Sequence, residues 1–247
     1  MKKLLALCLA LICLLSAPVS IQAERLSQAQ LFSYYNNSVF IGDSITAQLL
    51  VYVRERQQKD PSFFEGVKFL TAQSYFLYTA SRRNLLEKMA NLKYKGSEMP
   101  MCRILKDMKP TRAIILLGVN DYIGETIDKG MEYDERILDL CEEFAPDTEI
   151  IFQSLTPVTA SFCHRKDYRT MWDEYNEALK KLCEKRDAGY IDIAAPLKDD
   201  EGYLDEKLSS DGKYHLNPKG LQMWIDALLD YAQEQYDKGA WTPEVTK

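Results

Sequence analysis

Two patterns along the chain predict an α/β fold, in which a five-stranded parallel sheet is covered by helices on both faces. Five short runs are rich in β-branched and aromatic residues, and several lack polar–apolar alternation, as strands buried on both faces do. These runs are residues 38–41, 67–70, 113–117, 149–153 and 190–193. Helical stripes of apolar residues lie between them, and such alternation of strands and helices is typical of a parallel sheet.

Four helices are predicted from the spacing of their apolar residues. The stripes run through residues 45–53, 131–144, 172–182 and 221–229. The last helix has a clear start, because Asn217 is a suitable N-cap and Pro218 then occupies the first helical position. Residues 81–108 favour helix without a clear period, and residues 156–167 indicate a long loop.

The N-terminus differs from the rest of the 247-residue chain. Lys2 and Lys3 precede an apolar run over residues 4–15, and small residues follow up to Ala23, which is the pattern of a signal peptide over residues 1–23. An uncleaved anchor is the alternative. Residues 24–247 contain no repeat or linker and are interpreted as one domain.

The chain is acidic, with a formal net charge of −6 that becomes −8 when the two lysines of the predicted signal are removed. Without a dense basic run, this charge argues against nucleic acid or an anionic membrane surface as partner. Four cysteines lie outside the leading segment, none in a Cys-x-x-Cys pair, so a zinc or redox site has little support. Buried free thiols are favoured over disulfides for these residues, Cys102, Cys141, Cys163 and Cys183.

Three polar motifs follow or precede these elements at positions where a parallel sheet would gather them at one edge. Gly42-Asp43-Ser44 follows the first strand, Gly118-Val119-Asn120-Asp121 follows the third, and the segment 211–217 precedes the last helix. They contribute a serine, an amide, and the pair Asp211 and His215. These are the groups needed for acyl transfer through a serine nucleophile.

Each motif also has a plainer interpretation when it is taken alone. Ser44 could cap the following helix, Asn120 could belong to an ordinary turn, and His215 could lie at the surface after a polar turn. The other histidine, His164, lies in the predicted long loop without a patterned acid nearby, and is interpreted as a substrate-loop or surface residue.

Taken together, the order and spacing of the motifs resemble those of the SGNH hydrolases, also called the GDSL esterase/lipase family, over about residues 37–231. The resemblance implies a three-layer α/β/α sandwich of flavodoxin-like type. It makes Ser44 the nucleophile, His215 the base and Asp211 its partner. It also implies an oxyanion hole formed by the N–H of Ser44, the side chain of Asn120 and a backbone N–H of a second block.

Two departures from the family pattern stand out. The second block normally carries a glycine, but the matching residues 70–74 contain none, so Ala72 is assigned as the N–H donor. A left-handed backbone at that position would strain an alanine. The acid and the histidine are separated by three residues rather than two, which puts the role of Asp211 in question more than that of His215.

The sequence therefore predicts an exported serine esterase that acts on carboxylic esters, such as O-acetyl groups on glycans or small lipid esters, without a metal or organic cofactor. Its location would be secreted or in the cell envelope, without stable membrane insertion once the signal is cleaved. The main alternative is a non-catalytic relative that binds carbohydrate or serves the envelope. A nucleotide-binding domain is a weaker alternative, because no Gly-x-Gly-x-x-Gly or Walker pattern is present.

Overall fold

The computed structural model describes residues 25–121, 126–164 and 166–243, and its centre is a five-stranded parallel sheet. The strand order is β2-β1-β5-β6-β7, and every neighbouring pair is parallel. The strands are β1 (Ser38–Gly42), β2 (Lys68–Thr71), β5 (Arg112–Leu116), β6 (Glu149–Gln153) and β7 (Gly189–Ile191). All five predicted strands are thus present, with ends shifted by one or two residues.

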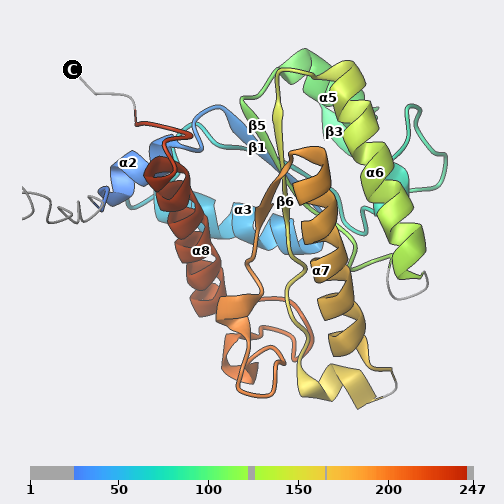
Figure 1. The fold of residues 1–247 in the computed structure, drawn as a ribbon, viewed down its shortest axis with the longest axis vertical. Coiled ribbons are helices and arrows are strands. Elements are labelled where there is room, and N and C mark those ends of the chain that lie inside the picture. Colours follow the sequence, from blue (N-terminus) through green and yellow to red (C-terminus); the bar gives the residue numbers. More distant parts are fainter. Residues whose placement is uncertain (1–24, 122–125, 165, 244–247) are drawn as a thin grey trace, which may run out of the picture.

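Helices cover both faces of this sheet, as the alternating pattern predicts (Figure 1). The long helices are α3 (Ser44–Gln57), α6 (Ile127–Phe144), α7 (Tyr168–Arg186) and α8 (Pro218–Asp237), and the shorter ones are α2 (Gln28–Ser33), α4 (Leu77–Ala80) and α5 (Met101–Met108). Helices α3 and α8 contact each other on one face, while α6 contacts α4, α5 and α7 on the other. The result is the three-layer α/β/α arrangement.

The core lies where these helices meet the two central strands. Val39, Phe40 and Ile41 of β1 are completely buried, and β5 is buried from Ala113 onward. Strands buried on both faces need apolar side chains at every position, which explains why these runs lack alternation. Cys102, Cys141 and Cys183 are buried free thiols, and Cys163 is a half-buried one, as expected from the sequence.

The segment 81–108 is where the prediction was wrong in part. The only helix within these residues is α5, and the segment also holds an antiparallel hairpin of β3 (Leu92–Tyr94) and β4 (Ser97–Met99). Both residues at the turn, Lys95 and Gly96, have positive φ, which is the conformation that hairpin turns with two central residues need. Lysine is not a usual residue there, so the sequence carried no clear turn signal.

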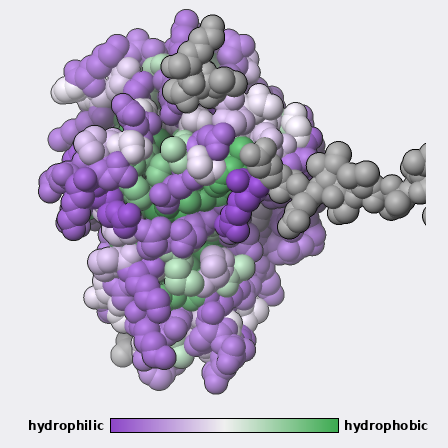
Figure 2. Space-filling view, turned by 90° about the vertical axis from the view of Figure 1, so that its left-hand side faces the viewer, coloured by the Kyte–Doolittle hydropathy of each residue, from purple (hydrophilic) through white to green (hydrophobic). Residues whose placement is uncertain are grey.

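The surface on the α8 side is mostly hydrophilic, and apolar patches appear there between polar side chains (Figure 2). Within the described residues, none of the helices combines the length and apolar character that a membrane crossing requires. The predicted signal peptide, residues 1–23, lies outside the described residues.

Candidate active site

Ser44 lies at the turn between β1 and α3, at the carboxyl edge of the sheet. It is the first residue of α3, and the N-cap of that helix is Asp43, whose Oδ1 accepts the N–H of Ile45 at 2.9 Å. Gly42 is required just before the turn, since a Cβ there would come within 2.6 Å of the Leu116 carbonyl. Ser44 is therefore not the cap, and its side chain is available for chemistry.

The partner histidine comes from the segment 209–216, called the histidine loop, which leads into α8. Asp211 folds this loop around its own carboxylate, because Oδ1 accepts the N–H groups of Lys213 at 2.8 Å and His215 at 3.3 Å. Gly212 between them has φ +69°, a left-handed conformation that glycine adopts without strain. This tight turn accommodates the extra residue between the acid and the histidine.

The histidine loop brings Asp211, His215 and Ser44 into one hydrogen-bonded line. Oδ2 of Asp211 lies 2.7 Å from Nδ1 of His215, and Nε2 of the same ring lies 3.0 Å from Oγ of Ser44. A carboxylate beside Nδ1 favours the tautomer that carries its proton there, and that tautomer leaves Nε2 able to accept a proton. His164 stands instead at the end of a short 3₁₀ helix, Ala160–His164, with an exposed side chain.

Burial opposes ionisation of Asp211, but hydrogen bonds from the His215 side chain and the Lys213 N–H outweigh it, and the pKa of this carboxyl lies below its usual value. Asp211 is therefore a carboxylate at neutral pH. A carboxylate next to the ring stabilises the imidazolium that forms when His215 takes a proton.

A second loop, residues 154–164, holds the histidine loop in place by hydrogen bonds and is called the brace loop. Thr159 is its main contact: the N–H donates to the Lys213 carbonyl at 2.8 Å and the hydroxyl to the Gly212 carbonyl at 2.6 Å. Ser161 donates to the same Gly212 carbonyl at 3.0 Å. Helix α3 adds Gln48, whose Oε1 accepts the N–H of Leu216 at 3.1 Å.

Asn120 follows β5 and lies next to Asp43. Its Nδ2 donates to Oδ2 of Asp43 at 2.7 Å and lies 3.4 Å from the Tyr75 carbonyl. An amide nitrogen carries two hydrogens, so Asp43 fixes one and the weaker second contact can give way to another acceptor. Burial raises the pKa of Asp43 to about 6, despite the hydrogen bond from Ile45 and the nearby His215.

The assignment of Ala72 as an oxyanion donor needs correction. Its N–H already donates to the Gly42 carbonyl at 3.3 Å, continuing the ladder between β1 and β2. The next residues form a tight turn closed by a hydrogen bond from the Tyr75 N–H to the Ala72 carbonyl, and Ser74 in this turn has φ +53°. The left-handed residue of this segment is therefore Ser74, whose side chain is exposed, and Ala72 does not have a positive φ.

Sequence reasoning missed two supporting aspartates. Asp43 was noted only as the middle of a motif, although it positions Asn120. Asp121 is buried, and its carboxylate accepts the N–H groups of Leu77 at 2.9 Å and Tyr78 at 3.2 Å, which anchors the start of α4 to the end of β5. The signal that could have found them is that each aspartate follows a buried strand within a few residues.

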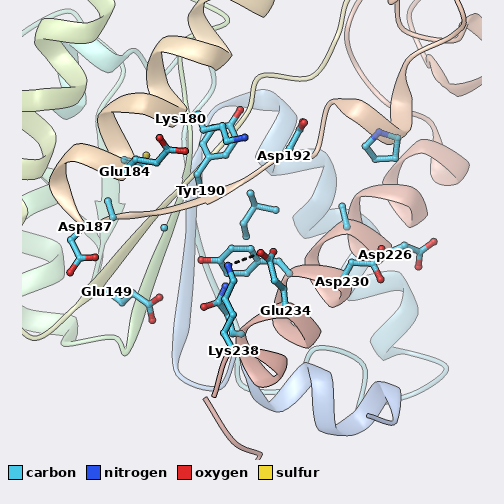
Figure 3. A pocket seen from close by; sticks show the side chains of 18 of the residues that line it. Glu149, Lys180, Glu184, Asp187, Tyr190, Asp192, Asp226, Asp230, Glu234 and Lys238 are labelled. Carbon is cyan, nitrogen blue, oxygen red and sulfur yellow. Dashed lines mark ion pairs between the residues drawn. The ribbon is translucent and has the colours of Figure 1, made fainter. Parts of the chain in front are cut away.

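Two of the surface grooves bear on the choice of site. One, the α3 groove, has a volume of about 350 Å³ and begins at Ser44; its other lining residues are Ala47, Gln48, Val51, Tyr52, Glu55, Gln73, Pro218 and Leu221. The other, about 950 Å³, follows the edge strand β7 between α7 and α8 (Figure 3). Seven carboxylates and two lysines line this second groove, and neither Ser44 nor His215 does.

No group of three or more His, Cys, Asp or Glu side chains suited to hold a metal ion occurs within the described parts of the chain. The groups that meet at the sheet edge are a nucleophile, a base with its acid, and an amide donor. This combination can transfer an acyl group.

Comparison with known proteins agrees with this chemistry. Residues 40–223 match the model of the GDSL-like lipase/acylhydrolase family. A GDSL-like lipase from Bacteroides thetaiotaomicron has a similar fold, with a TM-score of 0.60 and 16% identity over 86% of this chain and 92% of that one. A variant of an acetyl xylan esterase from Geobacillus stearothermophilus has a TM-score of 0.55 and 17% identity over 79% and 93%.

No curated protein sequence matches the chain closely enough to be counted as a relative. The two structural neighbours support the fold, and the family match, which spans well over half of the chain, supports the chemistry. The chain belongs to the GDSL-like lipase/acylhydrolase family and is an ester hydrolase.

Proposed function

We propose that this protein is an exported serine esterase that hydrolyses carboxylic esters through an acyl-enzyme on Ser44. The single observation that carries this proposal is the line from Asp211 through His215 to Ser44, with contacts of 2.7 and 3.0 Å. Each group has the neighbour that its role needs, since the serine meets a base and the base meets a carboxylate.

The reaction follows from these contacts. Nε2 of His215 takes the proton of Ser44 as Oγ forms a bond to the ester carbonyl carbon. The tetrahedral intermediate then breaks its bond to the alcohol oxygen, which receives the proton from His215. Water attacks the acyl-enzyme while His215 takes one of its protons, and that proton returns to Oγ of Ser44 as the free acid leaves.

The oxyanion in this proposal is held by Asn120 and by backbone N–H groups. The N–H of Ser44 lies in the first turn of α3, where helix N–H groups lack partners within the helix and the dipole favours negative charge. Asn120 is held for this role by Asp43.

Export is supported by the sequence pattern of residues 1–23, two lysines followed by an apolar run and small residues. The test is the intact mass of the protein recovered from the medium or cell envelope of an expressing bacterium. Loss of residues 1–23 is the expected result, and a full-length mass in the membrane fraction would indicate an anchor instead.

Two classes of ester fit an exported enzyme of this family: O-acetyl groups on glycans and small lipid esters. The acetyl xylan esterase among the structural neighbours makes the first class relevant to this chain by analogy.

Hydrolysis of p-nitrophenyl acetate by the full chain, compared with its Ser44→Ala variant, tests the catalytic part of the proposal. Turnover that disappears in the variant is expected. Equal rates for the two proteins would favour the non-catalytic alternative, a carbohydrate-binding or envelope protein. Labelling with a serine-directed fluorophosphonate then decides the matter, because only an activated Ser44 reacts.

A further inference from the structure

The α3 groove is the hollow that adjoins the nucleophile, and its chemistry bears on which esters the enzyme accepts. Ser44 lines one end, and the groove continues past Ala47 and Val51 along the exposed side of α3. These residues follow one another at one-turn intervals, so the groove extends roughly 10 Å from the serine to Val51 at 1.5 Å per helical residue. Its volume of about 350 Å³ is in the range of small-ligand pockets.

Four polar side chains besides Ser44 line this groove, Gln48, Tyr52, Glu55 and Gln73, and the first two are engaged with other parts of the protein. Gln48 donates to Ser210 at 3.4 Å and accepts the Leu216 N–H at 3.1 Å. The Tyr52 hydroxyl donates to Gln222 at 2.7 Å and accepts from Arg56 at 3.1 Å. A sugar ring needs several free donors and acceptors, whereas a hydrocarbon chain needs none.

The apolar residues of the groove also favour a hydrocarbon chain over a sugar ring. Val51 is 54% exposed, and it is one of only two large hydrophobic residues with an exposed side chain among the described residues, the other being Leu85 at 43%. Val51 stands beside Ala47, Pro218 and Leu221 in the groove lining. Apolar surface gathered in a hollow marks a binding groove more often than a scattered single residue does.

The position of His215 decides which half of an ester enters the groove. The leaving alcohol must lie next to Nε2, from which it receives its proton, and His215 is absent from the lining of the α3 groove. The residues packed against His215 are aromatic and are also absent from this lining: the centre of the Tyr214 ring lies 4.8 Å from that of the imidazole, and Phe162 and Trp172 pack on Tyr214. The acyl chain is the part that remains for the groove.

We propose that the α3 groove binds the hydrocarbon chain of the acyl group, with Val51 as a specificity-determining residue, so that the enzyme prefers medium-chain acyl esters to acetyl esters. This inference rests on the proposed esterase function of the same site. It selects lipid esters from the two classes considered there.

The test compares kcat/KM of the full chain for p-nitrophenyl acetate and p-nitrophenyl octanoate, which share a leaving group. The expected octanoate-to-acetate ratio is at least about tenfold, because added methylenes in an apolar pocket each improve binding of the transition state. Val51→Asp should lower this ratio about tenfold. Leu85→Asp is the matched control, since it adds the same charge at the other exposed apolar residue, outside the groove, and should leave the ratio unchanged.

Three results would overturn the inference. They are a preference for acetate, an octanoate preference that Val51→Asp does not alter, and faster cleavage of octyl acetate than of ethyl octanoate, which would place the chain on the alcohol side. Failure of the esterase proposal looks different, because neither ester would then show turnover that depends on Ser44.

Discussion

The site contains two aspartates that act on its two halves, and they lie in opposite surroundings. Asp43 is completely buried between β1 and α3, and burial raises its pKa to about 6. Asp211 lies on an exposed turn, where hydrogen bonds from His215 and Lys213 outweigh burial and keep its pKa below the usual value. The half that we propose to hold the oxyanion is thus built into the core, whereas the half that carries the proposed base is a surface loop held by hydrogen bonds.

This contrast predicts that removing the base lowers kcat more than removing its acid does. His215→Ala removes the base that contacts the Ser44 hydroxyl in the described part of the chain, so kcat should fall at least about ten-thousandfold. Asp211→Ala should cost about a hundredfold less, because the imidazole remains and the brace loop still holds the segment that carries it. Steady-state kinetics of both variants measure this, with thermal unfolding to verify that they are folded.

Equal losses in the two variants would show that the histidine loop depends on Asp211 for its shape. The Asp211 carboxylate accepts two N–H groups of the loop besides the imidazole, so this outcome has a definite structural meaning. Asp211→Asn separates the two contributions, since it keeps one acceptor oxygen for the backbone while removing the charge next to the ring.

The buried half is tested through Asp43→Asn. Asp43 uses one oxygen for the Ile45 N–H and the other for Asn120, and an amide replaces one of these acceptors by a donor. If the amide caps α3, Asn120 loses its partner, and kcat should fall about a hundredfold, as it does when an oxyanion donor is lost. An unchanged KM with lowered kcat would identify Asp43 as a positioning residue, while an unchanged kcat would contradict its link to Asn120.

Much of this architecture could be predicted from the sequence because it depends on buried strands. The positions of Ser44 and Asn120 follow from apolar runs that end in polar residues at the same edge of a parallel sheet. The accommodation of the extra residue before His215 could not be foreseen, since it depends on the left-handed Gly212 and on backbone N–H groups that turn toward Asp211. Ser74 was missed for a similar reason, because a serine with positive φ carries no sequence signature.

The two aspartates should also make the free energy of unfolding depend on pH in opposite directions. The pKa of Asp43 in the folded protein, about 6, is higher than the ordinary aspartate value of about 3.9, so the native state binds the extra proton between about pH 4 and pH 6. Its contribution to the free energy of unfolding is therefore present below about pH 4 and lost as the pH rises through 6, by at most about 3 kcal/mol. Asp211, with a lowered pKa, contributes stability at neutral pH that is lost on acidification.

Urea unfolding from about pH 2 to pH 7 measures these contributions when the natural protein is compared with Asp43→Asn and Asp211→Asn, neither of which titrates at the changed position. Relative to Asp43→Asn, the natural protein should lose stability as the pH rises. Relative to Asp211→Asn, it should gain. The same slope in both comparisons would mean that the contrast between buried and exposed carboxylates is wrong.

The smallest expected effect concerns the brace loop. Thr159→Val keeps the volume of a buried side chain but removes the hydroxyl that donates to the Gly212 carbonyl at 2.6 Å. Because the Thr159 N–H still holds Lys213 and Ser161 still reaches Gly212, the histidine loop should stay in place but with more freedom. We expect kcat to fall about tenfold, the size of effect that a slightly displaced base produces.

Thr156→Val is the matched control, since the Thr156 hydroxyl makes a longer contact of 3.3 Å to the Tyr214 carbonyl and its loss should lower kcat less. If the two variants have the same kcat as the natural protein, the hydrogen bonds within the histidine loop and from Gln48 suffice to position His215, and the base half is as self-supporting as the oxyanion half.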